Sequence, residues 1–258
     1  MTPDLLMLDW LLRQLPAEVS AWLVAQHDLV RHGVPDREFN LAFSLVPRRV
    51  GKADLDFEEC DLADAEASRP GWDPRGWSAD QVGRLILLLA VAERDGARFA
   101  ARLRDLMATA DLSETITILR GLPLYPGPQA HLGLARAGVR SGMRPVFEAV
   151  AHANPYAAEH FDEAGWNQLV VKALFIESTL APIQGLDRRA NATLMRMLCD
   201  YAHERWAAGR PVSPELWRCV GPWADAPARE DLARVRAAGS PAERAAAALA
   251  LAAAGAAS

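Results

Sequence analysis

Apolar residues recur along most of this chain at the spacing of an α-helix, and no segment alternates in the manner of a half-buried β-strand. Leu5, Leu8 and Leu12 follow one another at intervals of three or four residues, which places them on one face of a helix. We predict a first helix over Leu5–Gln14 and a second over Ala17–His32.

The segment between residues 35 and 77 breaks this pattern. Its periodicity is weak, an acidic run occupies residues 58–66, and the string RPGWDPRGWSAD is typical of a turn-rich linker. Ser78 then caps the next helix, and Gln81 stands at the third helical position as in a capping box. We therefore divide the chain into N-terminal helices with a linker, 1–77, and a helical region, 78–258, and expect the two to pack together.

Beyond residue 77, short helical runs alternate with Gly or Pro, so neighbouring helices are expected to be antiparallel. The predicted helices are Ala79–Glu93, Ala97–Ala108, Leu112–Gly121, Ala130–Val139, Arg144–Ala151, Ala157–Glu177, Asn191–Ala208, Pro214–Val220, Ala228–Ala238 and Pro241–Ala253. The fold class is all-α, and the succession of antiparallel helix pairs favours an α/α superhelix of the HEAT type. An irregular helical bundle is the alternative, because the chain has no strict internal period.

Composition supports the helical prediction and limits the function classes. Ala, Leu and Arg, which are strong helix formers, dominate the chain. The net charge is −5 and the pI is near 5.7, and no basic stripe is present, so we expect no nucleic-acid partner. The longest apolar run, Leu85–Ala92, is far shorter than the roughly 20 residues of a membrane span.

The cysteines and the N-terminus indicate a reducing compartment. Cys60, Cys199 and Cys219 are three in number and lack CxxC spacing, which favours small core residues over disulfides. The first residues include Asp4 and Asp9 and show no secretory signal pattern. We predict a cytoplasmic protein without an integral membrane segment, and leave peripheral membrane association open.

Polar side chains able to bind or react are densest between residues 154 and 210. The candidate ligand-binding residues are His160, Asn167, Gln168, Lys172, Gln184, Asp187, Arg189, Asn191 and His203. The helix around Lys172 is apolar nearly all round, so we expect it to be buried and the pKa of Lys172 to be lowered. In the following loop, Asp187 or Asn191 can cap the next helix and Arg189 can hold an anion.

Other readings of the same residues stay open. Lys172 can extend to the surface on its long stem, and His160 lies roughly 18 Å from it along one helix at 1.5 Å per residue. Metal ligation by His160 with Asp162, or His203 with Glu204, lacks any recognised ligand spacing. No GxSxG turn or Gly-rich phosphate loop is present. We therefore predict no metal and no cofactor, and assign no catalytic residue.

Three strings of unusual sequence then resemble one family. They are NPYAAEHFDEAGWNQLVVKALFIES, IQGLDRRAN and DYAHERWAAGR, and with ELWR they span about residues 154–217. These strings are similar to those of the EboA family. The resemblance implies a bacterial operon that also encodes a UbiA-type prenyltransferase, a TatD-like hydrolase, and sugar-isomerase-like or dehydroquinate-synthase-like proteins. It also implies a role in moving secondary-metabolite precursors, including the scytonemin monomer of cyanobacteria, towards the periplasm.

The resemblance carries no catalytic residues, so the function rests on three alternatives. We favour an accessory protein that binds a small polar or anionic metabolite, or an operon partner protein, in a groove lined by residues 154–191. An enzyme using Lys172 or His160 as acid or base, with Arg189 orienting a prenylated or polar metabolite, is the second alternative. A non-catalytic interaction scaffold is the third. A sealed hydrogen-bonded network would favour the scaffold, and an open pocket would favour binding or catalysis.

Overall fold

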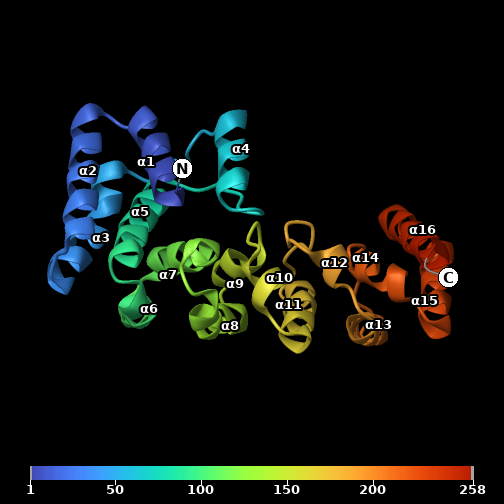
Figure 1. Cartoon of the computed structure of the whole chain (residues 1–258). Coiled ribbons are helices and arrows are strands. Elements are labelled where there is room, and N and C mark those ends of the chain that lie inside the picture. The colour runs from blue at the N-terminus through green and yellow to red at the C-terminus, as the bar shows by residue number, and fades with distance from the viewer. Residues whose placement is uncertain (1, 257–258) are drawn as a thin grey trace. The chain divides into compact units, whose positions relative to one another are not determined.

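The computed structural model describes residues 2–256 and confirms the predicted all-α class (Figure 1). Helices α1 to α16 and three short 3₁₀ helices make up most of the chain. Between residues 2 and 256 there is no β-strand, and an isolated bridge joins Asp54 to Ser78. The chain divides into two compact units, Met1–Tyr156 and Ala157–Ser258, which are described separately below.

The first unit begins with two helices close to their predicted bounds and continues to the end of α9. Its helices are α1 (Pro3–Gln14), α2 (Ala17–His32), α3 (Asp36–Val50), α4 (Glu59–Ser68), α5 (Ala79–Arg94), α6 (Gly96–Thr109), α7 (Leu112–Arg120), α8 (Leu132–Arg140) and α9 (Arg144–Ala151). Helices α1, α2 and α3 pack directly against α5, and α4 packs against α1. The division of the chain into domains at residue 77 stays a prediction.

Helix α5 forms the centre of the first unit. It packs against α1, α2, α3 and α7, and Figure 1 shows it among these helices. Nearly every side chain from Ala79 to Ala92 is buried, including the charged Asp80 and Arg84, and most of the helix surface is apolar, as expected of a buried helix. At Gly83 an added Cβ would lie 2.9 Å from Cγ1 of Val46, so the absence of a side chain lets α3 approach α5 closely.

Residues 35–77, where the apolar pattern of the sequence is weak, contain two helices. Asp36–Val50 forms α3, whose buried residues Phe39, Phe43 and Val46 recur at helical spacing. Pro47 lies inside this helix and disguised the pattern, because proline usually ends a helix. The acidic run also forms a helix, α4, whose first turn is closed by a capping box between Glu58 and Asp61.

The second unit is built from short helices that pack on their neighbours in sequence. Its helices are α11 (Glu163–Phe175), α12 (Leu186–Arg189), α13 (Ala192–Ala207), α14 (Leu216–Val220), α15 (Ala226–Ala238) and α16 (Pro241–Ala256). Helix α13 packs against α11, α14 and α15, and α15 packs against α16. Trp166 and Trp217 are completely buried in this unit. The HEAT-type superhelix stays a prediction.

The predicted single helix over Ala157–Glu177 was wrong. The chain forms α10 (Tyr156–His160), which begins at the unit boundary, and a separate α11 from Glu163. Asp162 causes the break, because its side chain accepts a hydrogen bond from the backbone N–H of Gly165 at 2.9 Å and so caps a new helix. His160 and Lys172 therefore lie on different helices.

None of the helices within residues 2–256 combines the length and the apolar character that crossing a bilayer requires. The longest apolar run of the sequence lies inside α5, where the other helices of the first unit cover it.

Candidate functional site

Two asparagines of the predicted polar stretch bind each other. Nδ2 of Asn191 donates to Oδ1 of Asn167 at 2.9 Å, and Nδ2 of Asn167 donates to Oδ1 of Asn191 at 3.2 Å. Oδ1 of Asn191 also accepts from the backbone N–H of Leu194 at 2.8 Å, which confirms that Asn191 caps α13. The pair joins the buried face of α11 to the start of α13.

Arg189 closes the end of a helix. Its Nη1 donates to the carbonyl oxygens of Ala157, Ala158 and Phe161 at 3.4, 3.0 and 2.8 Å. These carbonyls lie at the C-terminal end of α10, where helical backbone lacks donors. The guanidinium also lies over the ring of Trp166, with its carbon 5.0 Å from the ring centroid. Burial lowers the pKa of Arg189, and the contacts made by its Nη1 are structural.

The remaining predicted residues are spread over the second unit. Nε2 of His160 lies 3.5 Å from Glu159, and Nε2 of His203 lies 2.8 Å from Asp231 on α15. Asp187 binds Arg218 through two hydrogen bonds. Gln168 is exposed and Gln184 is half-buried. Lys172 is also half-buried, and burial lowers its pKa.

The structure therefore brings Asn167, Arg189 and Asn191 together. The Asn191 amide also donates to the backbone carbonyl oxygen of Arg189 at 3.1 Å, so the asparagine pair is tied to the backbone of the residue whose side chain closes α10. Ligand binding by the predicted set stays a prediction.

A polar pocket of about 250 Å³ lies in the first unit. It forms where the start of α5 meets α7 and α9, and residue 154, the first of the polar stretch, lies at its border. Its wall combines polar and apolar side chains, including Trp77, Gln81, Ile116, Arg120, Pro145 and His152. A concave site with a few polar groups among apolar ones is the usual form of a small-molecule site.

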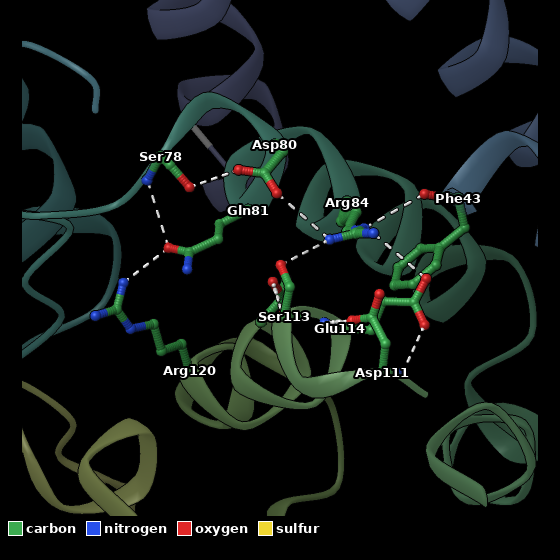
Figure 2. Close-up of polar contacts among 10 residues, drawn as sticks. Phe43, Ser78, Asp80, Gln81, Arg84, Asp111, Ser113, Glu114 and Arg120 are labelled. Atoms are coloured by element: carbon green, nitrogen blue, oxygen red, sulfur yellow. Dashed lines mark hydrogen bonds and ion pairs between the residues drawn. The ribbon is translucent and has the colours of Figure 1, made fainter. Parts of the chain in front are cut away.

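The polar wall of this pocket is anchored by the cap of α5 (Figure 2). Oε1 of Gln81 accepts from the backbone N–H of Ser78 at 3.4 Å and from Nη1 of Arg120 at 2.7 Å. The same Nη1 donates to the carbonyl oxygen of Gly76 at 3.1 Å. The capping box predicted from the sequence therefore also positions a guanidinium that lies 39 residues further along the chain.

Arg120 carries a charge with no close counter-ion. Its side chain is half-buried, and burial lowers its pKa, against the weaker opposing effect of the charge on Asp54. Within residues 2–256 no carboxylate lies within the 4.0 Å of an ion pair with Arg120, and its hydrogen bonds use Nη1 alone. A desolvated cation without a partner is unfavourable, so this guanidinium can gain from an added acceptor.

The opposite wall is held by Asn154. Its Nδ2 donates to the carbonyl oxygens of Leu119 and Ala149 at 3.2 and 3.0 Å, and its Oδ1 accepts from the N–H of Tyr156 at 3.0 Å. These bonds tie the end of α7 to the end of α9. The preceding Ala153 has φ +48°, a left-handed conformation that costs a non-glycine residue about 1 kcal/mol.

Behind the pocket, a buried ionic network links α5 to α7 (Figure 2). Arg84 lies 3.4 Å from Asp80 and 3.3 Å from Glu114, and its Nη1 donates to the hydroxyl of Ser113 at 3.1 Å. Ser78, the cap of α5, donates its hydroxyl proton to Asp80 at 2.6 Å. The pocket wall thus continues into a network that fixes α5 against α7.

The second unit contains an apolar groove of about 530 Å³ beside α16. Its lining is mostly Pro and Ala side chains with the exposed Leu249. The polar groups at its border are already paired. Asp187 binds Arg218 at 2.7 and 2.5 Å, and Glu215 accepts from the N–H groups of residues 180 and 181 at 2.8 and 3.2 Å.

Sequence reasoning missed the pocket of the first unit. The only signal for it was the capping box of Ser78 and Gln81, which is local to α5. Nothing in the sequence connects that cap to Arg120, because the contact depends on how α5 and α7 pack.

A family model described as metabolite traffic protein EboA matches residues 3–221 of the chain. No curated protein and no solved structure matches the chain. The polar pocket lies entirely within the matched residues, whereas the apolar groove depends on α16, which lies beyond them.

Proposed function

The chain belongs to the EboA family, whose model covers residues 3–221, and on this basis we propose that it is an accessory protein of metabolite traffic that binds a small molecule in its polar pocket. The observation that carries the proposal is the pocket of about 250 Å³ with Arg120 on its wall. A half-buried guanidinium has lost part of its hydration, and this one has no carboxylate partner. Binding of a ligand that supplies an acceptor is therefore favourable.

Binding without chemistry fits the available side chains better than catalysis does. Burial raises the pKa of the Cys199 thiol to about 12 and that of Cys219 to about 11, so neither forms the thiolate that a cysteine nucleophile needs. The enzymatic alternative requires Arg189 to orient a substrate, but Nη1 of this residue donates to three backbone carbonyls.

The contacts of the 154–191 stretch give the scaffold alternative a physical basis. Asn167, Asn191 and Arg189 join α10, α11, α12 and α13 into one network. We propose that this network keeps the second unit rigid, while Asp187 borders the apolar groove. Lys172, Gln168, Gln184, His160 and His203 stay candidates for ligand or partner contacts.

The family resemblance supports three finer proposals. The protein acts in the cytoplasm beside partner proteins encoded with it. Together they move a secondary-metabolite precursor towards the periplasm. Within each unit, successive helix pairs stack in the manner of HEAT-like repeats.

Native mass spectrometry tests the binding function directly. The purified protein is incubated with a small-molecule extract of the cells that produce it, and bound mass is measured. Ile116→Trp fills the pocket from α7, and Ile176→Trp makes the same change at a half-buried position outside it. We expect a bound molecule on the parent and on Ile176→Trp, and its loss from Ile116→Trp. A ligand that stays on Ile116→Trp, or no ligand on the parent, contradicts the proposal.

A further inference from the structure

We infer that the pocket of the first unit recognises a monocarboxylate, with the carboxylate bound by Arg120 and a flat or cyclic body of about ten non-hydrogen atoms against its apolar wall. This inference rests on the proposed function and adds the chemical class of the ligand.

Two other arginines of the chain show how Arg120 would bind such a group. Nε and Nη2 of Arg75 contact the two oxygens of Asp73 at 2.8 and 2.5 Å. Nε and Nη2 of Arg218 contact those of Asp187 at 2.7 and 2.5 Å. In both pairs one edge of the guanidinium holds both oxygens of one carboxylate, the bidentate geometry typical of Arg.

The same edge of Arg120 lacks a carboxylate. Its Nη1 is held by Gln81 and by the carbonyl of Gly76, which leaves Nε and Nη2 without a hydrogen bond among residues 2–256. Nε2 of Gln81 likewise donates no hydrogen bond within that range, since the contacts of this side chain use Oε1. The wall therefore offers a surplus of donors, and the matching ligand group is an acceptor.

Charge balance favours one negative charge on the ligand. The other charged pairs at the pocket are already compensated, because Arg75 is bound to Asp73 and Glu148 lies 2.7 Å from Arg144. Arg120 is thus the cation at the pocket that lacks a carboxylate within 4.0 Å among residues 2–256, and Asp54 acts on it only from a longer distance. A singly charged carboxylate neutralises it, whereas a dianionic phosphate would bring an excess negative charge into a partly dehydrated site.

The volume and the apolar wall define the rest of the ligand. A cavity of 150 Å³ can hold benzene, so the observed 250 Å³ corresponds to about ten non-hydrogen atoms. Trp77, Ile116 and Pro145 supply apolar surface next to the donors. The pocket is thus suited to a ring that carries one carboxylate.

Calorimetric titration of the full chain with three probes tests this class. The probes are benzoate, its neutral counterpart benzamide, and inorganic phosphate. We expect benzoate to bind at least tenfold more tightly than benzamide, because a hydrogen bond to a charged group corresponds to a factor of roughly ten to a hundred in affinity. Phosphate is expected to bind more weakly than benzoate.

Variants of Arg120 locate the effect. Arg120→Gln is expected to weaken benzoate binding at least tenfold, and Arg120→Lys to weaken it less, since Lys keeps the charge but loses the planar pair of donors. Arg140→Gln makes the same change at an exposed arginine at the end of α8 and is expected to bind like the parent. If Arg120→Gln does not fold, the Lys variant and the benzoate–benzamide comparison decide.

The failure of this inference differs from the failure of the proposed function. Any one of four results overturns the monocarboxylate class. Benzoate and benzamide bind equally, phosphate binds more tightly than benzoate, benzoate does not bind at all, or the Arg120→Gln variant binds benzoate like the parent. The native mass spectrometry with Ile116→Trp separately decides whether the pocket carries any metabolite.

Discussion

Nε of Arg84 lies 3.4 Å from the carbonyl oxygen of Phe43, an acceptor on a neighbouring helix. In an unbroken helix this carbonyl would receive the N–H of residue 47, but Pro47 has none. Arg84 thus replaces a missing helical donor in α3 while it binds two acidic residues, Asp80 and Glu114. Its guanidinium carbon also lies 5.3 Å from the ring centroid of Phe43.

Arg84→Met is therefore expected to destabilise the first unit strongly. The change leaves the buried Asp80 and the half-buried Glu114 without their cation, and breaking a buried ion pair on one side costs about 3–5 kcal/mol. Urea unfolding followed by circular dichroism measures the loss. Arg98→Met, at an exposed position of α6, is the matched control, and equal unfolding of the two variants would contradict the role of the network.

Asn191 is expected to contribute to stability through two separable contacts. Asn191→Ala loses the cap of α13, at about 1 kcal/mol, and leaves the buried amide of Asn167 without its partner, at about 1–3 kcal/mol more. Asn191→Asp keeps the oxygen that caps α13 and accepts from Asn167 but loses the Nδ2 donor, so its melting temperature should lie between those of the parent and Asn191→Ala. The control Asn40→Ala alters an exposed asparagine of α3. Identical melting of the Ala and Asp variants would contradict a contribution from the capping oxygen.

The contact of Asp4 with His27 predicts a dependence of stability on pH. Nε2 of His27 lies 3.6 Å from Oδ2 of Asp4, and this contact holds the pKa of Asp4 at about 2, against the opposing effect of burial. The unfolded chain has a pKa of about 3.9 at this group. The folded pKa is the lower one, so the stabilisation, roughly 2 kcal/mol, is present above about pH 4 and is lost as the pH falls towards 2.

Asp4→Asn should therefore unfold more easily at pH 7 and lose less stability than the parent between pH 4 and pH 2. Urea unfolding at several pH values measures both effects. Asp105→Asn, at an exposed site of α6, should follow the parent curve. A parallel pH dependence of the parent and Asp4→Asn would refute the assignment.

Gly221 permits the close packing of α16 on the second unit. A Cβ added at Gly221 would lie 2.6 Å from the carbonyl oxygen of Ala250 and 2.7 Å from its Cα. Gly221→Ala must therefore displace α16, with an expected cost of about 1–3 kcal/mol. At Gly133, inside α8, an added Cβ meets no atom within 4 Å, so Gly133→Ala should stabilise its helix by about 0.5–1 kcal/mol. Thermal melts of both variants, with limited proteolysis of α16, test this contrast, and equal melts would count against it.

Local features of the fold could be predicted from the sequence because their causes are local. Helix periodicity, the capping box of Ser78 and Gln81, and the cap at Asn191 all depend on residues a few positions apart. The same local reasoning failed where two signals competed. Pro47 concealed the apolar spacing of α3, and Asp162 interrupted a run that otherwise reads as one helix.

The candidate pocket could not be predicted because its contacts join distant parts of the chain. Arg120 meets Gln81 and the carbonyl of Gly76, which lie 39 and 44 residues earlier. Conversely, the sequence made Arg189 appear available for a ligand. Its carbonyl partners lie 28 to 32 residues earlier, at the end of α10. The sequence analysis joined α10 and α11 into one helix, so this helix end was not expected.

The bonds that Asn154 makes to the ends of α7 and α9 have a consequence for affinity. They fix the wall of the pocket that contains Asn154 with interactions internal to the protein, and Gln81 fixes Arg120 in the same way. A ligand therefore meets a preorganised receptor and spends little of its interaction energy on ordering the wall. Under the proposed function, a molecule with few atoms would then bind more tightly than its size alone predicts.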